Sequence, residues 1–300
     1  MDARTAFLST RPWSFTMTFS SVTMGALLAA IAGRFNPILY VLTLGGMIAF
    51  HAATNVLNDF YDVKHGVDRE GAPTTKYRLH PAAFGQVPLG TTLTFSVALY
   101  AVTIAVGLYL AFATSLAILA VIAAGILGSV FYTADPVDLK ARSLGEPTVF
   151  VMWGLLIPLG AYMVQTGTFE WVPMLASIPI GIFVALVLLA NNIRDVSYDG
   201  SVKERTLAVA LGAGQAERVY VGLLALAYAL VAAGTLVEQL PVWSLLVFLT
   251  APAAIRLAGM FKGAVPDDAD PRTAALALQF SLLYMASMVL FIAFPLKLPV

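Results

Sequence analysis

Asparagine and aspartate residues gather where the second long apolar segment of the chain ends. Asn55, Asp59 and Asp62 are four and three residues apart, so a helix would carry them on one face, with Asn58 beside them. Asp68 follows shortly afterwards. Closely spaced carboxylates repel one another and are costly to bury alone, and a divalent cation relieves both penalties. This spacing indicates a metal site, with Mg²⁺ favoured because proteins hold it with few carboxylates plus water and substrate phosphates.

A second cluster of the same composition follows a later apolar segment. The step from Asn191 to Asp195 repeats the four-residue step of the first cluster, and the step from Asp195 to Asp199 repeats it again, with Asn192 and Arg194 lying between. Two matching clusters at corresponding helix ends predict two half-sites that hold metal ions against a diphosphate. A solvated acidic helix cap is the simpler alternative for either cluster alone.

Basic residues close to both clusters are candidates for binding phosphate oxygens. Lys203 and Arg205 follow the second cluster, and the loop after the fourth apolar segment carries Lys140 and Arg142, with Tyr132 just before it. Ordinary juxtamembrane charge and, for Tyr132, a place at the membrane interface are the alternatives. The loop after the first cluster adds three further candidates: Lys64, Arg69 and Arg78.

Segment 64–88 is longer and more charged than a simple connection needs to be. It predicts a lid over the site with a short helix near 79–85, which closes when a diphosphate binds. A basic loop that only follows the charge rule of membrane topology is the alternative. His65 and His80 lie in this loop without the paired spacing of a zinc site, so we assign no zinc.

Composition identifies a membrane protein. Of the 300 residues, 59% are hydrophobic and only 11% are charged, against about 25% charged in soluble domains. The zero net charge offers no field for nucleic acid, and the absence of cysteine excludes disulfides and thiolate chemistry. We expect an all-α bundle of nine transmembrane helices with cytoplasmic cap loops. The predicted spans are 14–33, 37–58, 90–111, 114–132, 145–165, 172–192, 217–237, 241–261 and 273–294.

The distribution of basic residues predicts the orientation in the bilayer. With nine spans, all but two of the 17 Lys and Arg residues fall on one side, the exceptions being Arg34 and Lys297. Positive charge accumulates on the cytoplasmic side of membrane proteins. We therefore expect a protein of the inner (cytoplasmic) membrane with the N-terminus and both clusters on the cytoplasmic side.

Together these residues resemble the UbiA superfamily of intramembrane aromatic prenyltransferases, which carry the motifs Asn-Asp-x-x-Asp-x-x-x-Asp and Asp-x-x-x-Asp at cytoplasmic helix ends. Here the first motif departs from the family, because six residues instead of four separate Asp62 from Asp68. The family's Tyr-x-x-x-Lys is also not reproduced, since Tyr132 stands eight residues before Lys140. Similarity to the 1,4-dihydroxy-2-naphthoate (menaquinone) branch rests on that longer spacing and on Asn191-Asn-Ile-Arg-Asp, Arg205-Thr-Leu-Ala-Val and Arg11-Pro-Trp.

The resemblance implies one domain, 1–300, with pseudo-repeated halves 1–140 and 141–300, that uses Mg²⁺ to transfer a polyprenyl group from its diphosphate to an aromatic acceptor. Asp59, Asp62, Asp195, Asp199 and Lys140 would carry the reaction, with Asp68 as a further metal ligand. The favoured acceptor is 1,4-dihydroxy-2-naphthoate; 4-hydroxybenzoate, a chlorin or a glycerol-ether lipid are alternatives. A transporter of an anionic substrate would instead place its site at the midplane. Candidates for steadying an allylic cation are the aromatic residues Phe60, Tyr61, Phe131, Tyr132 and Trp153.

Overall fold

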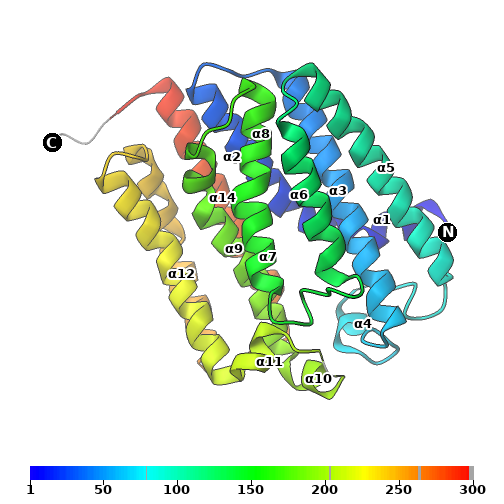
Figure 1. Cartoon of the computed structure of the whole chain (residues 1–300). Coiled ribbons are helices and arrows are strands. Elements are labelled where there is room, and N and C mark those ends of the chain that lie inside the picture. Colours follow the sequence, from blue (N-terminus) through cyan, green and yellow to red (C-terminus); the bar gives the residue numbers. More distant parts are fainter. Residues whose placement is uncertain (79, 203, 263–264, 297–300) are drawn as a thin grey trace.

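The computed structural model describes residues 1–78, 80–202, 204–262 and 265–296, and these residues form an all-helical bundle. The long helices stand side by side, and the short helices α4, α10 and α11 lie together at one end (Figure 1). Within the described ranges there is no strand, and the one β-type pairing is an isolated bridge between Arg142 and Arg205. The all-α prediction is therefore confirmed.

The helices and helical turns run in chain order as α1 (Ala3–Ser9), a 3₁₀ turn (Pro12–Ser14), α2 (Phe15–Ile31), α3 (Pro37–Lys64), α4 (Pro73–Tyr77), α5 (Leu89–Ala113), α6 (Ile118–Thr133), α7 (Gly145–Phe150), a π-helical segment (Val151–Leu156), α8 (Ile157–Thr166), α9 (Val172–Arg194), α10 (Val196–Ser201), α11 (Leu207–Leu211), α12 (Ala213–Leu236), a 3₁₀ segment (Val242–Thr250), α13 (Ala251–Met260) and α14 (Ala269–Ala293).

Eight helices in the described part of the chain are long and apolar enough to cross a membrane, and each overlaps a predicted span. The remaining predicted span, 114–132, corresponds to α6, an apolar helix of 16 residues. A helix of that length rises about 24 Å, less than the roughly 30 Å of hydrocarbon in a bilayer. The structure thus supports a many-span helical membrane protein, and a ninth crossing by α6 stays a prediction.

Helix α9 occupies the centre of the bundle, where it packs against α2, α12 and α14. Its Phe183 is fully buried, with its ring centroid 4.4 Å from that of Phe280. Gly181 of α9 faces Gly154 of the π-helical segment, and a Cβ added to Gly181 would lie 2.4 Å from the Gly154 Cα. Glycine is required at this crossing, because any side chain would separate the two backbones. The close approach brings the start of α7 beside the end of α9.

Helix α3 presents the first polar cluster and is longer than the sequence predicts. Asn36 caps its start by accepting hydrogen bonds from the backbone N–H groups of Ile38 and Leu39. The helix continues past the predicted end at residue 58 to Lys64 and stops before Gly66, whose φ is +76°. This conformation suits glycine and commonly ends helices. Asn55, Asn58, Asp59 and Asp62 therefore lie on the last three turns of a single helix, and Asp68 lies just beyond its end.

The predicted short helix near 79–85 is wrong. The loop after α3 forms its helix earlier, as α4 over Pro73–Tyr77, where proline occupies the first turn that it favours. The backbone around 81–85 forms turns, and the N–H of Ala83 donates to Nδ1 of His80. Such a side-chain bond offers the backbone an alternative to a helix. Position 79 lies outside the described residues.

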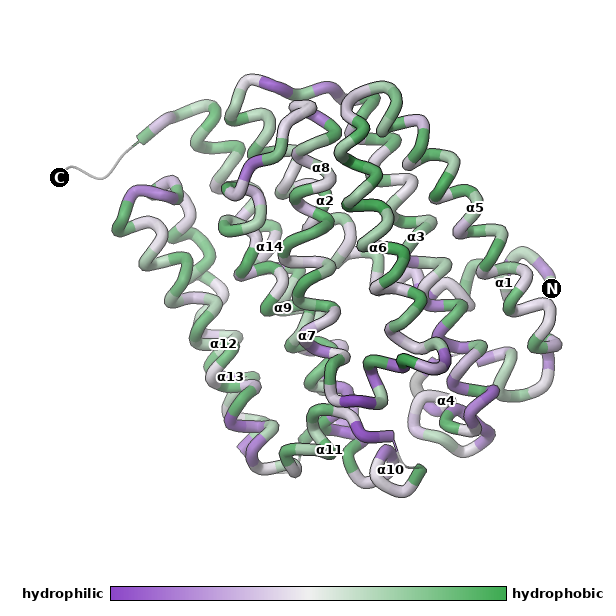
Figure 2. The backbone as a smooth tube through the Cα atoms, in the orientation of Figure 1, coloured by the Kyte–Doolittle hydropathy of each residue, from purple (hydrophilic) through white to green (hydrophobic). Residues whose placement is uncertain are grey.

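Hydrophilic residues gather at the end of the bundle that holds α4, α10 and α11, whereas the long helices are mostly apolar between their ends (Figure 2). The last turns of α3 and α9 lead to this same end (Figure 1). The hydroxyl of Tyr198 on α10 donates to the carbonyl of Val67, which follows α3, at 2.7 Å. The two aspartate clusters therefore meet at one end of the bundle.

Candidate active site

Asp59 on α3 is buried between two guanidinium groups. Arg78 from the loop donates to both of its carboxylate oxygens, at 2.7 and 3.1 Å, and Arg11 from the N-terminal segment forms an ion pair with Oδ1. Only 3% of Asp59 is exposed, so these contacts replace solvent. Burial lowers the pKa of Arg11, but the nearby Asp59 outweighs it and leaves that pKa raised. Arg11 therefore stays charged, although sequence reasoning did not count it among the site residues.

The N-terminal segment is fastened to α3 by Asn55, a residue that the sequence assigned to substrate binding. Asn55 donates to the carbonyl of Thr10 at 2.9 Å and to Oγ of Ser14 at 3.2 Å. Ser14 in turn donates to the carbonyl of Arg11 at 2.7 Å. Arg11 has a φ of +56°, an uncommon value for a residue other than glycine. These bonds hold the strained turn that directs Arg11 to Asp59, so Asn55 acts here as a structural anchor.

Asp62 accepts from Asn58 on α3 at 2.7 Å and forms an ion pair with Lys140. The backbone N–H of Lys140 donates to the carbonyl of Tyr132 at 3.0 Å, because the loop after α6 folds back on the end of that helix. Tyr132 and Lys140, which were separate candidates in the sequence, thus lie side by side in the structure. Burial lowers the pKa of Lys140, but Asp62 and Glu204 outweigh it and raise that pKa.

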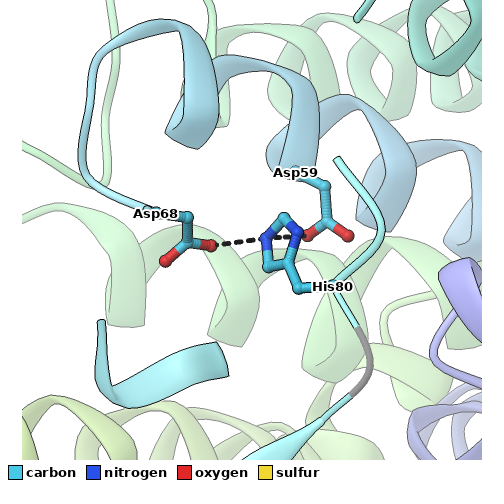
Figure 3. A group of neighbouring side chains, drawn as sticks. All are labelled: Asp59, Asp68 and His80. Carbon is cyan, nitrogen blue, oxygen red and sulfur yellow. Dashed lines mark hydrogen bonds and ion pairs between the residues drawn. The ribbon is translucent and has the colours of Figure 1, made fainter. Parts of the chain in front are cut away.

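Asp68 and His80 form a buried pair beside Asp59. Nε2 of His80 lies 2.8 Å from Oδ2 of Asp68 and 3.7 Å from Oδ1 of Asp59, so the ring stands between the two carboxylates (Figure 3). The three residues offer ligand atoms within 4.8 Å of one another, a spacing that a metal ion could use. His80 is inaccessible to solvent. No second histidine stands near His80 at the spacing of a metal site, so the sequence did not predict that it lies between these carboxylates.

In the second cluster, Asp195 is paired with its own neighbour. Arg194 donates to both carboxylate oxygens of Asp195, at 2.7 and 2.8 Å, and to Oδ1 of Asn191 at 2.8 Å. It also forms an ion pair with Asp270 on α14. Arg194 also donates to the carbonyl of Asp267 at 3.3 Å, so it joins the second cluster to the start of α14.

Asn192 faces another helix. Its amide donates to Oε1 of Glu146 on α7 at 2.9 Å, while Oε2 of Glu146 is buried with no partner among the described residues. Glu146 was not predicted, because a single glutamate at a helix start carries no sequence signal.

Asp199 has no side-chain hydrogen bond or ion pair within the described ranges. Burial raises the pKa of Asp199 to about 7, and the neighbouring Asp195 adds to the rise. Burial also raises the pKa of Glu204, whose Oε2 is buried without a partner. Carboxylates thus gather here, and the charge of Lys140 lowers the pKa of both without outweighing burial. Lys203, a predicted phosphate contact beside these groups, lies outside the described residues.

Four other predicted phosphate contacts are exposed in this structure. Lys64 pairs with Asp135 at 3.0 Å on the surface, and Arg142 donates to the carbonyl of Pro136 at 2.8 Å. Arg69 has no ion pair among the described residues, and Arg205 contributes only backbone to its bridge with Arg142. Their proximity to the clusters in sequence did not translate into contact with the buried carboxylates.

Comparison with known proteins agrees with this architecture. Residues 18–283 match the UbiA prenyltransferase family. The chain is 27% identical to 1,4-dihydroxy-2-naphthoate octaprenyltransferase of Bacillus subtilis, over 82% of this chain and 78% of that protein. It is 30% identical to UbiA prenyltransferase domain-containing protein 1 of Mus musculus, over 94% of this chain and 83% of that protein.

Solved structures share the fold. A UbiA homologue from Aeropyrum pernix superposes with a TM-score of 0.71 at 20% identity, covering 92% of this chain and 97% of that one. One from Archaeoglobus fulgidus, solved bound to DMAPP and Mg²⁺, gives a TM-score of 0.63 at 15% identity, covering 95% of this chain and 99% of that one. The extent of the family match decides the assignment: this chain belongs to the UbiA prenyltransferase family and is a prenyltransferase.

Proposed function

We propose that this protein uses Mg²⁺ to transfer a polyprenyl group from a polyprenyl diphosphate to 1,4-dihydroxy-2-naphthoate, as in menaquinone biosynthesis. The observation that carries the proposal is the meeting of two aspartate clusters with Arg11, Arg78 and Lys140 at one end of an apolar bundle. The acceptor rests on the Bacillus subtilis relative and its printed activity. The position of the clusters at helix ends disfavours a transporter, which would use a midplane site.

The carboxylates fit a hard divalent cation, which prefers oxygen ligands. Asp59, Asp62, Asp195 and Asp199 would hold Mg²⁺ together with the diphosphate. The strongest sign is Asp199, which has no side-chain partner among the described residues, with the similarly unpaired Oε2 of Glu204 in the same region. When bound, Mg²⁺ would supply positive charge that stabilises the departing diphosphate. The Archaeoglobus fulgidus homologue bound to DMAPP and Mg²⁺ supports this choice of metal.

The protein's own cations complete the electrostatic environment. Arg11, Arg78 and Lys140 would donate charge-assisted hydrogen bonds to the diphosphate oxygens as the allylic C–O bond breaks. The allylic cation that remains must be kept from water and is steadied by aromatic faces, for which Tyr132 beside Lys140 is well placed. The acceptor ring carbon then forms the new C–C bond and the ring loses a proton.

The prenyl tail needs an apolar channel. A cavity of about 100 Å³ lies between α3, α5, α6 and α8, with Phe50 and Met47 among its lining residues. Phe50 precedes Asp59 by nine residues on α3, about 14 Å along the helix. The tail would extend from the diphosphate site into this cavity.

The membrane arrangement completes the proposal. We infer that α6 makes a ninth crossing, because it starts at the end of the bundle away from the clusters and leads to the cluster end (Figure 1). The distribution of basic residues favours an N-terminus and an active site on the cytoplasmic side. The chain forms one domain, 1–300, whose halves 1–140 and 141–300 each contribute one aspartate cluster, and the 64–88 loop closes over the site when diphosphate binds.

The test is transfer of label from a radioactive polyprenyl diphosphate by the purified protein in lipid nanodiscs. We expect labelled product with 1,4-dihydroxy-2-naphthoate, loss of transfer in excess EDTA, and recovery when Mg²⁺ is restored. Transfer only to 4-hydroxybenzoate, a chlorin or a glycerol-ether lipid would replace the acceptor and keep the reaction. No transfer to any acceptor, or full activity in EDTA, would refute the proposal.

A further inference from the structure

Asp68 leaves the helix face that carries the other aspartates of its motif. Helix α3 ends at Lys64, and the backbone turns at Gly66 with a φ of +76°. The N–H groups of Val67 and Asp68 then donate to the carbonyl of Asp62, at 2.8 and 3.1 Å. The chain has therefore folded back beneath the helix end. The six-residue spacing from Asp62 to Asp68 is what this turn requires, and it directs Asp68 toward the loop.

His80, the partner of Asp68, makes a hydrogen bond at each of its two ring nitrogens. Nδ1 of His80 accepts from the N–H of Ala83 at 3.3 Å, which assigns the ring proton of a neutral histidine to Nε2. Nε2 therefore donates to Asp68 at 2.8 Å. A histidine that binds metal through Nε2 usually donates from Nδ1, the opposite of the arrangement here. His80 is thus built to hold Asp68 instead of a metal ion.

Arg78 arrives at Asp59 from the same short stretch of loop. It stands two residues before His80 in the chain, and its guanidinium lies 3.6 Å from Oδ2 of Asp68. Its side chain is only 9% exposed, and both of its terminal nitrogens donate to Asp59. His80, two positions further along the chain, is held in place by its bond to Asp68. Fixing His80 therefore also fixes where Arg78 can reach.

We propose that Asp68 and His80 are positioning residues that set Arg78 at Asp59, and that Asp68 takes no part in holding the metal. The proposal rests on the proposed function for the role of Arg78, which is to contact the diphosphate. Burial raises the pKa of Asp68, but the hydrogen bond from His80 and the nearby charge of Arg78 outweigh it, so that pKa is lowered and Asp68 stays an acceptor.

The test measures the kinetics of Asp68→Asn, of His80→Leu and of the double variant that carries both substitutions. Arg78→Ala is the reference for these three. We expect KM for the polyprenyl diphosphate to rise about tenfold in each, with the double variant no worse than either single one, because all remove the same contact. His80→Gln keeps an N–H donor and should recover part of the loss. His65→Leu, which changes a histidine outside the cluster, is the matched control and should behave as the wild type.

Metal binding separates positioning from ligation. Mn²⁺ affinity, measured by electron paramagnetic resonance with a non-hydrolysable prenyl thiodiphosphate present, should be unchanged in Asp68→Asn and clearly lower in Asp199→Asn. A tenfold loss of Mn²⁺ affinity in Asp68→Asn that His80→Leu does not share would overturn the proposal, since it would make Asp68 a metal ligand. Additive KM effects in the double variant would overturn it as well.

A separate readout does not depend on the reaction. If the wild type neither binds the analogue nor transfers a prenyl group, the proposed function fails. The Asp68–His80 contact is then judged by unfolding in detergent, where the two substitutions should show a coupling energy in a double-mutant cycle. Independent effects of the two substitutions on unfolding would refute the contact itself.

Discussion

The two aspartate clusters end α3 and α9 with similar spacings, yet their carboxylates are satisfied in different ways. Asp59 is paired with Arg11 and Arg78, and Asp62 with Lys140, all from other segments of the chain. Asp195 instead pairs with the adjacent Arg194, and Asp199 has no partner among the described residues.

This difference indicates that the two clusters have different roles. The first cluster gathers the N-terminal segment, the loop after α3 and the loop after α6 around one helix end, and so contributes to stability as well as to chemistry. The second leaves the half-buried carboxylate of Asp199 without a side-chain partner among the described residues, which is costly for folding and favourable for binding a cation. Equivalent substitutions in the two clusters should therefore have different consequences for stability.

Asp59→Asn should have the largest effect. It leaves Arg11 and Arg78 buried against a neutral amide, and breaking a buried ion pair from one side costs about 3–5 kcal/mol. We expect a lower unfolding midpoint in detergent and turnover reduced by at least about 100-fold. Unfolding followed by tryptophan fluorescence, alongside label transfer, checks both. Unchanged stability would show that the first cluster does not hold these segments together.

Asp199→Asn should affect catalysis without affecting stability. We expect turnover to fall by about 100-fold or more, because a metal ligand is lost. The unfolding free energy should stay the same or rise, since the substitution neutralises a half-buried carboxylate that makes no side-chain hydrogen bond or ion pair with the described residues. The same two measurements apply, with Asp59→Asn as the comparison. A destabilised Asp199→Asn would mean that this carboxylate has a structural partner and that the contrast between clusters is wrong.

Arg69→Ala should have the smallest effect. Arg69 is exposed and makes no ion pair in the described part of the chain, so kcat/KM should stay within about twofold of the wild type. Arg78→Ala is the comparison, because both arginines lie in the loop after α3 and only Arg78 reaches a buried carboxylate. Steady-state kinetics with varied prenyl diphosphate would test this. A large loss in Arg69→Ala would show that the loop closes further over the diphosphate than it does here.

Much of the architecture could be predicted because it depends on local patterns. Apolar segments of about 20 residues identify membrane helices, since lipid satisfies no backbone polar group. The spacing of Asn55, Asp59 and Asp62 placed them on one helix face for an equally local reason. The family resemblance came from these same residues, and it is confirmed by the match over 18–283.

The partners of the carboxylates depended on the tertiary structure. Arg11 and Lys140 lie 48 and 78 positions from the aspartates they contact, and nothing in their local sequence states where their loops fold. The eight-residue spacing of Tyr132 and Lys140 did not show that they lie together, because a backbone hydrogen bond across a folded loop joins them. The sequence by itself determined which groups are charged and which segments are buried in lipid. Which cation neutralises which buried carboxylate was decided only when the bundle brought distant loops to one end and excluded the water that would otherwise solvate them.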